Sequence, residues 1–413
     1  MASPDNKRRA VYRHAELARL FNPRSVAVYG ASPNPQSIGA RTIANMRQFR
    51  GDILRINPRY AAIGDAPCYP SVAALPVAPD CAVLAMPRDG VEAALLDCAS
   101  RGVGGAVIFA SGYSEMVQPE RIAEQARLTA IARESGIKII GPNCLGFINF
   151  VAGAMVSFAS GEMQVNAPRG PGIGIVSQSG ALGFALGQAE RRGVNVSHVL
   201  TFGNGADVNI ADEIAFLAGD PGCAAIACLF EGMPQPMQLL EAGELARQAG
   251  KPVVICKLGV GTAAATAALS HTGSLTGSTE AWRALFERAG FTVVPAIEHV
   301  IETAAFFAKV GPPQARGVAV MGASGGALIA ATDAAETHGV DMPQLPDDIR
   351  QKLRPYVPEF GALRNPCDLT AMFTKDNTIA GAAAEVLLAG DTYGALVVQI
   401  GRASCRERVS VLV

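Results

Sequence analysis

One histidine in this sequence stands in a setting that suits chemistry on a bulky tetrahedral group. His271 lies within Ala268–Gly277, where small, hydroxylated and glycine residues leave space beside the ring. The other four histidines lack such surroundings. A neutral imidazole is nucleophilic near neutral pH, so this loop is a candidate reaction centre. A loop histidine that hydrogen-bonds only its neighbours has the same local sequence, and the rest of the chain must decide between the two.

The first glycine-rich turn indicates a phosphate-binding unit. An expected buried strand, Ser25–Tyr29, runs into the turn Gly30–Gly39, and an expected helix follows over residues 40–48. In doubly wound sheets, the backbone amides of such a turn and the helix N-terminus face an anion. The turn is longer than the glycine fingerprint of dinucleotide-binding proteins. We therefore expect a phosphate-bearing ligand here.

The second expected strand argues against a nicotinamide cofactor. Such a cofactor usually needs an acidic residue at this strand end to hold its ribose. The sequence here reads Asp52–Arg59 and ends on Asn57-Pro58-Arg59 instead. Arg55 and Arg59 suit a 2′- or 3′-phosphate better. The next expected strand, Cys81–Ala85, ends at Met86-Pro87, and the strand over residues 138–140 ends at Gly141-Pro142-Asn143-Cys144.

A second strand–turn–helix unit begins at Gly172 and turns at Ser177-Gln178-Ser179-Gly180. The helix N-terminus after Gly180 is a second candidate anion site, and a packing turn without a ligand is the alternative. Further along, the strand over residues 224–230 ends at Glu231. A carboxylate there is placed to accept a histidine N–H, although a solvated strand end is equally compatible.

A third unit of the same kind starts near Arg316 and turns at Gly322–Gly326. Strands alternating with helices predict parallel sheets and an α/β fold. Residues 399–413 break this pattern and resemble the translation of a DNA-sequencing adapter. We therefore expect the native sequence to stop near Val398 and the third unit to be incomplete; an ordinary basic tail is the alternative.

Composition narrows the classes of protein. The 413 residues predict two or three domains, and the formal net charge of −1 gives no electrostatic signature of nucleic-acid or membrane binding. The nine cysteines include no C-x-x-C pair, so we expect no metal site and reduced thiols in the cytoplasm. No signal peptide or membrane span is expected.

Six motifs, taken in their order along the chain, resemble those of one family, the NDP-forming acyl-CoA synthetases. The family includes ADP-forming acetate–CoA ligase and, more distantly, the α subunit of succinyl-CoA synthetase. The resemblance covers about residues 12–398. The motifs are Gly30-Ala31-Ser32, Asn57-Pro58, Gly141-Pro142-Asn143, Ser177-Gln178-Ser179-Gly180, Glu231-Gly232 and Ser270-His271-Thr272-Gly273.

The resemblance implies a fold and a reaction. A CoA-binding Rossmann-like domain (residues 12–150) is followed by a flavodoxin-like phosphohistidine domain (165–310). An incomplete third flavodoxin-like domain (315–398) and a non-native tail (399–413) complete the chain. The implied reaction interconverts acyl-CoA, ADP and phosphate with carboxylic acid, CoA and ATP. Nucleotide and Mg²⁺ would bind an ATP-grasp domain absent from this sequence, either fused or on a partner subunit, and an oligomer is expected.

The resemblance also implies roles for particular residues. His271 would carry the phosphoryl group, and Glu231 would hold the far nitrogen of its ring. The remaining implied residues bind either phosphate or CoA. For phosphate they are Ser177, Gln178, Ser179, Gly180, Ser270, Thr272 and Gly273; for CoA they are Gly30, Ala31, Ser32, Gly39, Asn57, Arg59, Pro87 and Asn143.

Two other functions stay open from the sequence. One is a non-catalytic module of a larger protein that senses CoA or acyl-CoA, although such modules tend to lose the histidine. The other is an NAD(P)-dependent oxidoreductase, which the missing ribose acid disfavours. The acyl group and the choice between ADP and GDP cannot be read from these residues.

Overall fold

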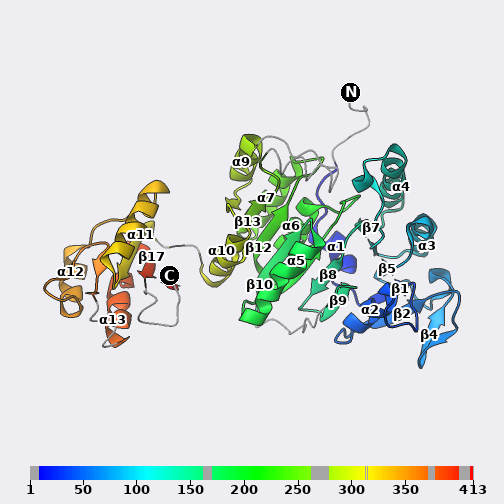
Figure 1. The fold of residues 1–413 in the computed structure, drawn as a ribbon, viewed down its shortest axis with the longest axis horizontal. Helices are drawn as coiled ribbons and strands as arrows, with labels where there is room; N and C mark the ends of the chain where they lie inside the picture. The colour runs from blue at the N-terminus through cyan, green and yellow to red at the C-terminus, as the bar shows by residue number, and fades with distance from the viewer. Residues whose placement is uncertain are drawn as a thin grey trace. The chain divides into compact units, whose positions relative to one another are not determined.

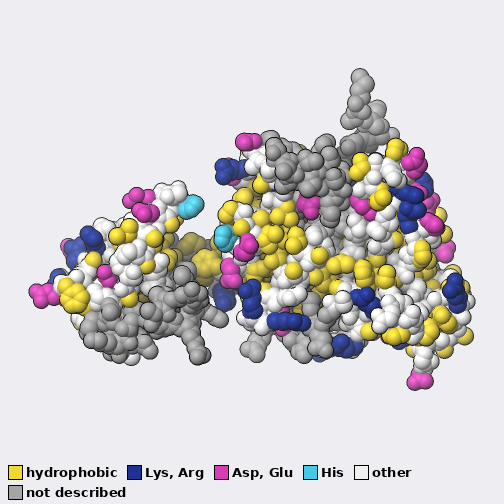
Figure 2. All heavy atoms as spheres, viewed as in Figure 1, with side chains coloured by type: hydrophobic (Ala, Val, Ile, Leu, Met, Phe, Trp, Pro, Cys, Tyr) yellow, Lys and Arg dark blue, Asp and Glu magenta, His cyan; other side chains and the backbone are white. Residues whose placement is uncertain are grey.

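The structure is a computed structural model that describes residues 9–160, 170–261, 279–311, 313, 315–370 and 377–399, and the backbone of 410–412. The chain forms two compact units, Met1–Lys309 and Val310–Val413. Within the described residues, no helix is both long enough and apolar enough to cross a bilayer. Acidic and basic side chains are interspersed on the face of the first unit seen in Figure 2.

The first sheet has seven strands in the order β3-β4-β2-β1-β5-β6-β7, and all neighbours except β3 and β4 are parallel. Its strands are β1 (Ser25–Tyr29), β2 (Asp52–Ile56), β3 (Ala62–Ile63), β4 (Ala66–Tyr69), β5 (Cys81–Leu84), β6 (Gly105–Ile108) and β7 (Lys138–Ile140). The accompanying helices are α1 (His14–Phe21), α2 (Ile38–Asn45), α3 (Val91–Arg101) and α4 (Pro119–Ser135), with short 3-10 turns η1 (Val72–Ala74), η2 (Arg88–Gly90) and η3 (Ser114–Met116).

The second sheet also has seven strands, in the order β14-β13-β12-β10-β11-β8-β9. They are β8 (Gly146–Asn149), β9 (Ala154–Ser157), β10 (Gly172–Ser177), β11 (Val196–Thr201), β12 (Cys223–Phe230), β13 (Val253–Lys257) and β14 (Thr292–Val293). The helices are α5 (Gly180–Gly187), α6 (Ile210–Gly219), α7 (Gln238–Gln248), α9 (Thr279–Arg288) and α10 (Glu298–Lys309), with the 3-10 turn η4 (Gln188–Arg192).

The β8–β9 hairpin belongs to the second sheet, although residues 146–149 fall within the range expected for the first domain. Strand β8 pairs antiparallel with β11 and with β9. Both strands are fully buried, and α2 of the first domain packs on the edge strand β9.

Helices α1 and α6 lie side by side (Figure 1): α6 packs on β10 and β12 of the second sheet, and α1 contacts β5 and β6 of the first. Every residue from Ile210 to Ala218 is buried. One apolar cluster runs from Val26 and Val107 of the first sheet through Phe216 of α6 to Val176 and Cys228 of the second. Because burial of apolar surface is the main stabilising term, the two sheets form one cooperative body.

The second unit carries a sheet of the order β16-β15-β17-β18, in which β15 pairs parallel with β16 and β17. Residues 410–412 pair antiparallel with β17. The strands are β15 (Gly317–Gly322), β16 (Cys367–Asp368), β17 (Tyr393–Gln399) and β18 (Ser410–Leu412), and the helices are α11 (Gly325–Thr337), α12 (Asp347–Leu353) and α13 (Asn377–Leu388), with η5 (Arg354–Tyr356). The predicted α/β fold of parallel-dominated sheets is confirmed in both units.

Candidate active site

The turn after β1 is shaped by close backbone approaches that only glycine permits. Gly30 has φ of 74°, and a Cβ placed on it would lie 2.1 Å from the carbonyl oxygen of Ala85. A Cβ on Gly39 would lie 2.2 Å from the carbonyl oxygen of Gly30. Helix α2 therefore starts directly over the strand end. Its N-cap residue, Ser37, accepts a hydrogen bond from the Ala40 amide at 3.2 Å.

Asn57 fixes the conformation of this turn from the neighbouring strand β2. Its Nδ2 donates to the Ala31 carbonyl at 2.7 Å, and its Oδ1 accepts from the Arg59 amide at 3.0 Å. Ala31 is buried, Ser32 is half-buried, and the Arg59 side chain is exposed. Asn57 thus holds the turn rather than presenting a free carboxamide. The structure brings together Gly30, Ala31, Ser32, Gly39, Asn57 and Arg59 and places Pro87 just beyond Ala85.

The turn after β10 is tighter and more deeply buried. Only Gln178 and Ser179 separate β10 from α5. The Ser177 hydroxyl donates to the Ser179 carbonyl at 2.7 Å, and the Ser179 hydroxyl accepts from the Leu182 amide at 3.4 Å. The first helical amides of α5 lie at this carboxyl end of the sheet, where helix N-termini attract anions.

Gln178 connects this turn to the end of β12. Its Oε1 accepts from the amides of Glu231 and Gly232, at 2.9 and 3.3 Å respectively. A single carboxamide thereby places Glu231, Ser177 and the α5 N-terminus at one edge of the second sheet. We infer that this edge can hold a small anion next to a carboxylate.

Lys257 adds a cation at the same edge and was not foreseen from the sequence. It ends β13 and is the strand partner of Phe230, the residue before Glu231. Burial lowers the pKa of Lys257, and the negative charge of Glu231 opposes that shift. Its position directly before a loop, at a strand end in a parallel sheet, was the only available signal.

The predicted reaction centre itself lies outside the described residues. Ser270, His271, Thr272 and Gly273 fall within residues 262–278. The described chain approaches this segment from both sides, through Val260 after β13 and Thr279 at the start of α9, whose hydroxyl donates to the Val260 carbonyl at 3.1 Å.

Asn143 lies apart from the Gly30 turn, after β7, where the first two domains meet. Its Nδ2 donates to Asn204 Oδ1 at 3.3 Å, and Asn204 Nδ2 in turn donates to Glu115 Oε2 at 2.6 Å. Asn204 and Glu115 were not among the predicted site residues. The adjacent Cys144 is buried, and burial raises the pKa of its thiol to about 12, which disfavours the reactive thiolate.

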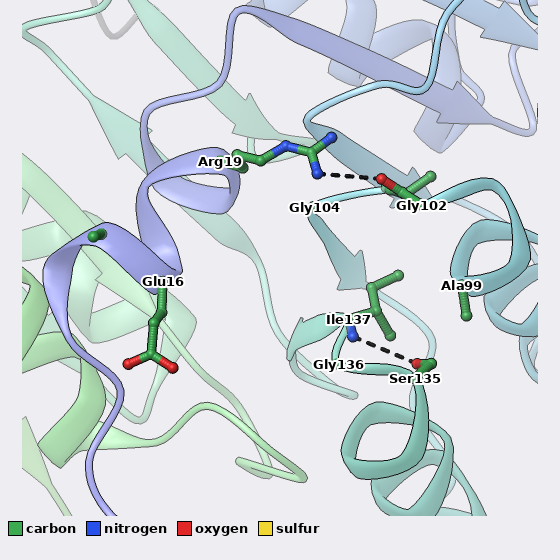
Figure 3. A pocket seen from close by; sticks show the side chains of 10 residues that line it. Glu16, Arg19, Ala99, Gly102, Gly104, Ser135, Gly136 and Ile137 are labelled. Carbon is green, nitrogen blue, oxygen red and sulfur yellow. Dashed lines mark hydrogen bonds between the residues drawn. The ribbon is translucent and has the colours of Figure 1, made fainter.

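A cavity of about 320 Å³ lies at the opposite edge of the first sheet and does not involve the predicted site residues. It is lined by Arg19 and by the residues that precede β6 and β7 (Figure 3). The Arg19 guanidinium is already bonded to Asp80 and to the carbonyl of Gly102. In parallel sheets ligands bind at the carboxyl ends of strands, so this cavity is not the candidate site.

The fold and the two candidate anion-binding turns are compatible with a CoA-dependent ligase, and comparison with known proteins identifies the family. A CoA binding domain model matches residues 24–149, a succinyl-CoA ligase like flavodoxin domain model matches 170–307, and a ligase-CoA domain model matches 318–385. The chain is 31% identical over 357 residues to the α subunit of ADP-forming acetate–CoA ligase II from Pyrococcus furiosus, covering 86% of this chain and 76% of that subunit. The chain belongs to this family of ADP-forming acyl-CoA ligases.

Two further comparisons concern a longer relative and a protein whose structure has been solved. The chain is 34% identical to a trans-feruloyl-CoA synthase from an unknown prokaryotic organism, with coverage of 94% of this chain but 55% of that protein. It therefore spans about half the length of that relative. The apo dinucleotide forming acetyl-coenzyme A synthetase 1 of Ca. Korarchaeum cryptofilum superimposes with a TM-score of 0.84 at 27% identity, covering 94% of this chain and 83% of that one. Its complex with phosphate and ADP gives a TM-score of 0.82.

Proposed function

We propose that this chain is the CoA-binding and phosphohistidine portion of an ADP-forming acyl-CoA synthetase. The observation that carries the proposal is the pairing of two strand–turn–helix units in one compact unit of the chain, with the Glu231 amide bonded to Gln178 in the second turn. We assign residues 12–150 to CoA binding, 165–310 to phosphoryl transfer through His271, and 315–398 to a third domain.

The proposed chemistry has three steps. An oxygen of inorganic phosphate attacks the thioester carbonyl; the C–S bond breaks, and the departing CoA thiolate takes the proton that phosphate loses. His271 then attacks phosphorus in the acyl phosphate, forming an N–P bond and releasing the carboxylate. Finally ADP accepts the phosphoryl group from His271, which gives ATP. A histidine carrier is needed because thioester and nucleotide do not fit one confined site.

Glu231 would hold the second nitrogen of the His271 ring and so fix its tautomer. Ser177, Gln178, Ser179 and Gly180 would receive the phosphoryl group at the start of α5, together with Ser270, Thr272 and Gly273. Preorganised donors of this kind are worth about 3–4 kcal/mol each when one is removed from an oxyanion site. The nearby Lys257 ammonium would add to the field that attracts the phosphate.

CoA would bind across the Gly30 turn. Ser32 is half-buried, and a side chain at Gly30 or Gly39 would collide with backbone, so a ligand can approach the main chain closely. Asn57 shapes the turn, Arg59 faces a phosphate of the adenosine, and Pro87 and Asn143 lie toward the thioester. This cradle fits a substrate that carries several phosphates and a long arm.

The nucleotide half of the reaction requires a second component. We propose that ADP or ATP, with Mg²⁺, binds an ATP-grasp domain on a partner subunit or on a further part of a longer chain. Support comes from the relatives: one is named as an α subunit, and a similar structure is a complex with phosphate and ADP.

The test follows labelled inorganic phosphate into the protein. We expect acetyl-CoA or feruloyl-CoA, with labelled phosphate and no nucleotide, to give an acid-labile, base-stable adduct. His271→Ala should abolish it, whereas His299→Ala, which alters an exposed histidine on α10, should not. Labelling that survives His271→Ala would remove this histidine from the mechanism.

A further inference from the structure

The first two domains meet along two backbone runs at the carboxyl ends of β7 and β11. The Gly141 amide donates to the Phe202 carbonyl at 3.1 Å, and the Asn204 amide donates to the Pro142 carbonyl at 3.0 Å. Gly203 has φ of 57°, and a Cβ there would lie 2.4 Å from the Asn143 carbonyl oxygen. The second domain is therefore locked against the loop that carries Asn143.

The orientation of the Asn204 carboxamide is fixed by its acceptors. Its Nδ2 donates to Glu115 Oε2 at 2.6 Å and to Gln125 Oε1 at 2.9 Å. The Glu115 carboxylate has no proton to donate, and it also accepts the amides of Gly112 and Tyr113 at 2.6 and 3.1 Å. Asn204 must therefore turn its Oδ1 toward Asn143.

The orientation of the Asn204 carboxamide fixes that of the Asn143 carboxamide. Because Asn204 presents an acceptor, Asn143 must face it with Nδ2, as it does at 3.3 Å. The Oδ1 of Asn143 then points away from the contact, and among the described residues it has no hydrogen-bond partner. Asn143 is half-buried and has a left-handed backbone, with φ of 58°. This contact between the two domains, which we call the seam, thus presents one acceptor, Asn143 Oδ1. Its orientation is fixed by Asn204 of the second domain.

We propose that Asn204 is a positioning residue that holds Asn143 Oδ1 to accept an amide N–H from the pantetheine arm of CoA. The inference rests on the proposed CoA site. A donor is the required partner because Asn143 offers an oxygen, and the nearby Glu115 carboxylate disfavours an anion. The arm of CoA carries two amide N–H groups. The second domain thereby completes the CoA site of the first.

The experiment separates the arm from the nucleotide end by using two ligands. Calorimetry measures the affinity of the chain for CoA and for adenosine 3′,5′-bisphosphate, which lacks the arm. Asn204→Asp places a carboxylate against Glu115 and breaks the fixed orientation. We expect CoA affinity to fall about tenfold, the scale of one misplaced hydrogen bond, with bisphosphate affinity unchanged within about twofold.

Two further variants keep the test decisive. Asn195→Asp is the matched control, since Asn195 Nδ2 also donates to two acceptors, the carbonyls of Gly170 and Pro171, away from the seam; both affinities should stay at the wild-type level. Asn143→Gly keeps the left-handed backbone while deleting the carboxamide, and should reproduce the CoA-specific loss. Adding Asn204→Asp to it should then cause no further loss, because both act on one contact.

The outcomes distinguish this inference from the proposed function. A wild-type chain that binds neither ligand overturns both. A wild-type chain that binds both, with Asn204→Asp weakening the two ligands equally or neither, overturns the positioning role alone. Additive losses in the double variant would overturn it as well. Should Asn204→Asp fail to fold, a wild-type CoA affinity in Asn143→Gly would still reject the proposal.

Discussion

The two candidate anion-binding turns are built from the same strand–turn–helix unit but differ in depth and length. Residues 30–37 separate β1 from α2, and Pro33 to Gln36 are exposed. Residues 178 and 179 alone separate β10 from α5, and both Ser177 and Gln178 are buried. The first turn is held open by backbone contacts at glycine; the second is drawn tight by side-chain hydroxyls and one carboxamide.

The difference would suit the same unit to two kinds of ligand. A long, exposed turn has room for a large molecule that extends beyond it, as the proposed CoA does. A short, buried turn suits a small tetrahedral group shielded from water, where hydrogen bonds are strongest. A substitution in one turn should therefore leave the function assigned to the other turn intact.

Gly30→Ala should have the largest effect and should strike CoA binding alone. The substitution combines a positive φ, which costs about 1 kcal/mol or more for a side chain, with a 2.1 Å clash against the Ala85 carbonyl. We expect CoA affinity to fall more than about 100-fold by calorimetry. Gly102→Ala, with φ of 76° and open space around its Cβ, is the matched control and should bind CoA normally.

The buried His198, on β11 of the second sheet, should make the free energy of unfolding fall at acid pH. Burial lowers the pKa of His198 to about 4, although Asp220, 3.9 Å away, opposes the shift. The unfolded chain takes up this proton near pH 6.5, before the folded one does, so stability present above that pH is lost as pH falls toward 4. The loss in the free energy of unfolding that His198 can cause is at most about 3 kcal/mol.

The measurement compares urea unfolding of the wild type and of His198→Leu at pH 7.5 and 4.5. The free energy of unfolding of His198→Leu minus that of the wild type should be more positive at pH 4.5 than at pH 7.5. The difference between the two proteins is the relevant quantity, because burial raises the pKa of Glu213, whose protonation in acid acts in the opposite direction. Parallel pH profiles would contradict the assignment to His198.

Gln178→Ala should impair the second turn without affecting the first. It leaves the amides of Glu231 and Gly232 without their acceptor, and a buried unsatisfied N–H costs about 1–3 kcal/mol. We expect the rate of phosphate labelling to fall about 10- to 100-fold while CoA affinity stays constant. Gln188→Ala, at an exposed position in η4, is the control; equal loss of CoA binding in Gln178→Ala would undo the separation of the two turns.

Both turns could be predicted from the sequence because each is a local pattern. An apolar strand, a run of small residues and a helix are contiguous, and the strand Ser25–Tyr29 has the predicted bounds. The Asn143–Asn204–Glu115 contacts were missed because they join three loops distant in sequence. A lone asparagine or glutamate in a loop carries no spacing that marks its partner. The β8–β9 hairpin was missed because its strands are too short for periodicity to reveal.

Arg59 should contribute least, because its side chain is exposed at the rim of the first turn. An exposed ion pair is worth about 0–1 kcal/mol, so Arg59→Ala should weaken CoA binding by about two- to fivefold, less so at high salt. Arg59→Lys should stay within about twofold, since either cation can face a phosphate. Arg50→Ala, which changes an exposed arginine that precedes β2 rather than following it, is the control.

Dephospho-CoA sharpens the comparison, as it lacks the 3′-phosphate. If Arg59 meets that group, the wild type should lose affinity for dephospho-CoA and Arg59→Ala should lose nothing more. Equal losses from Arg59→Ala with both ligands would place Arg59 beside a different phosphate.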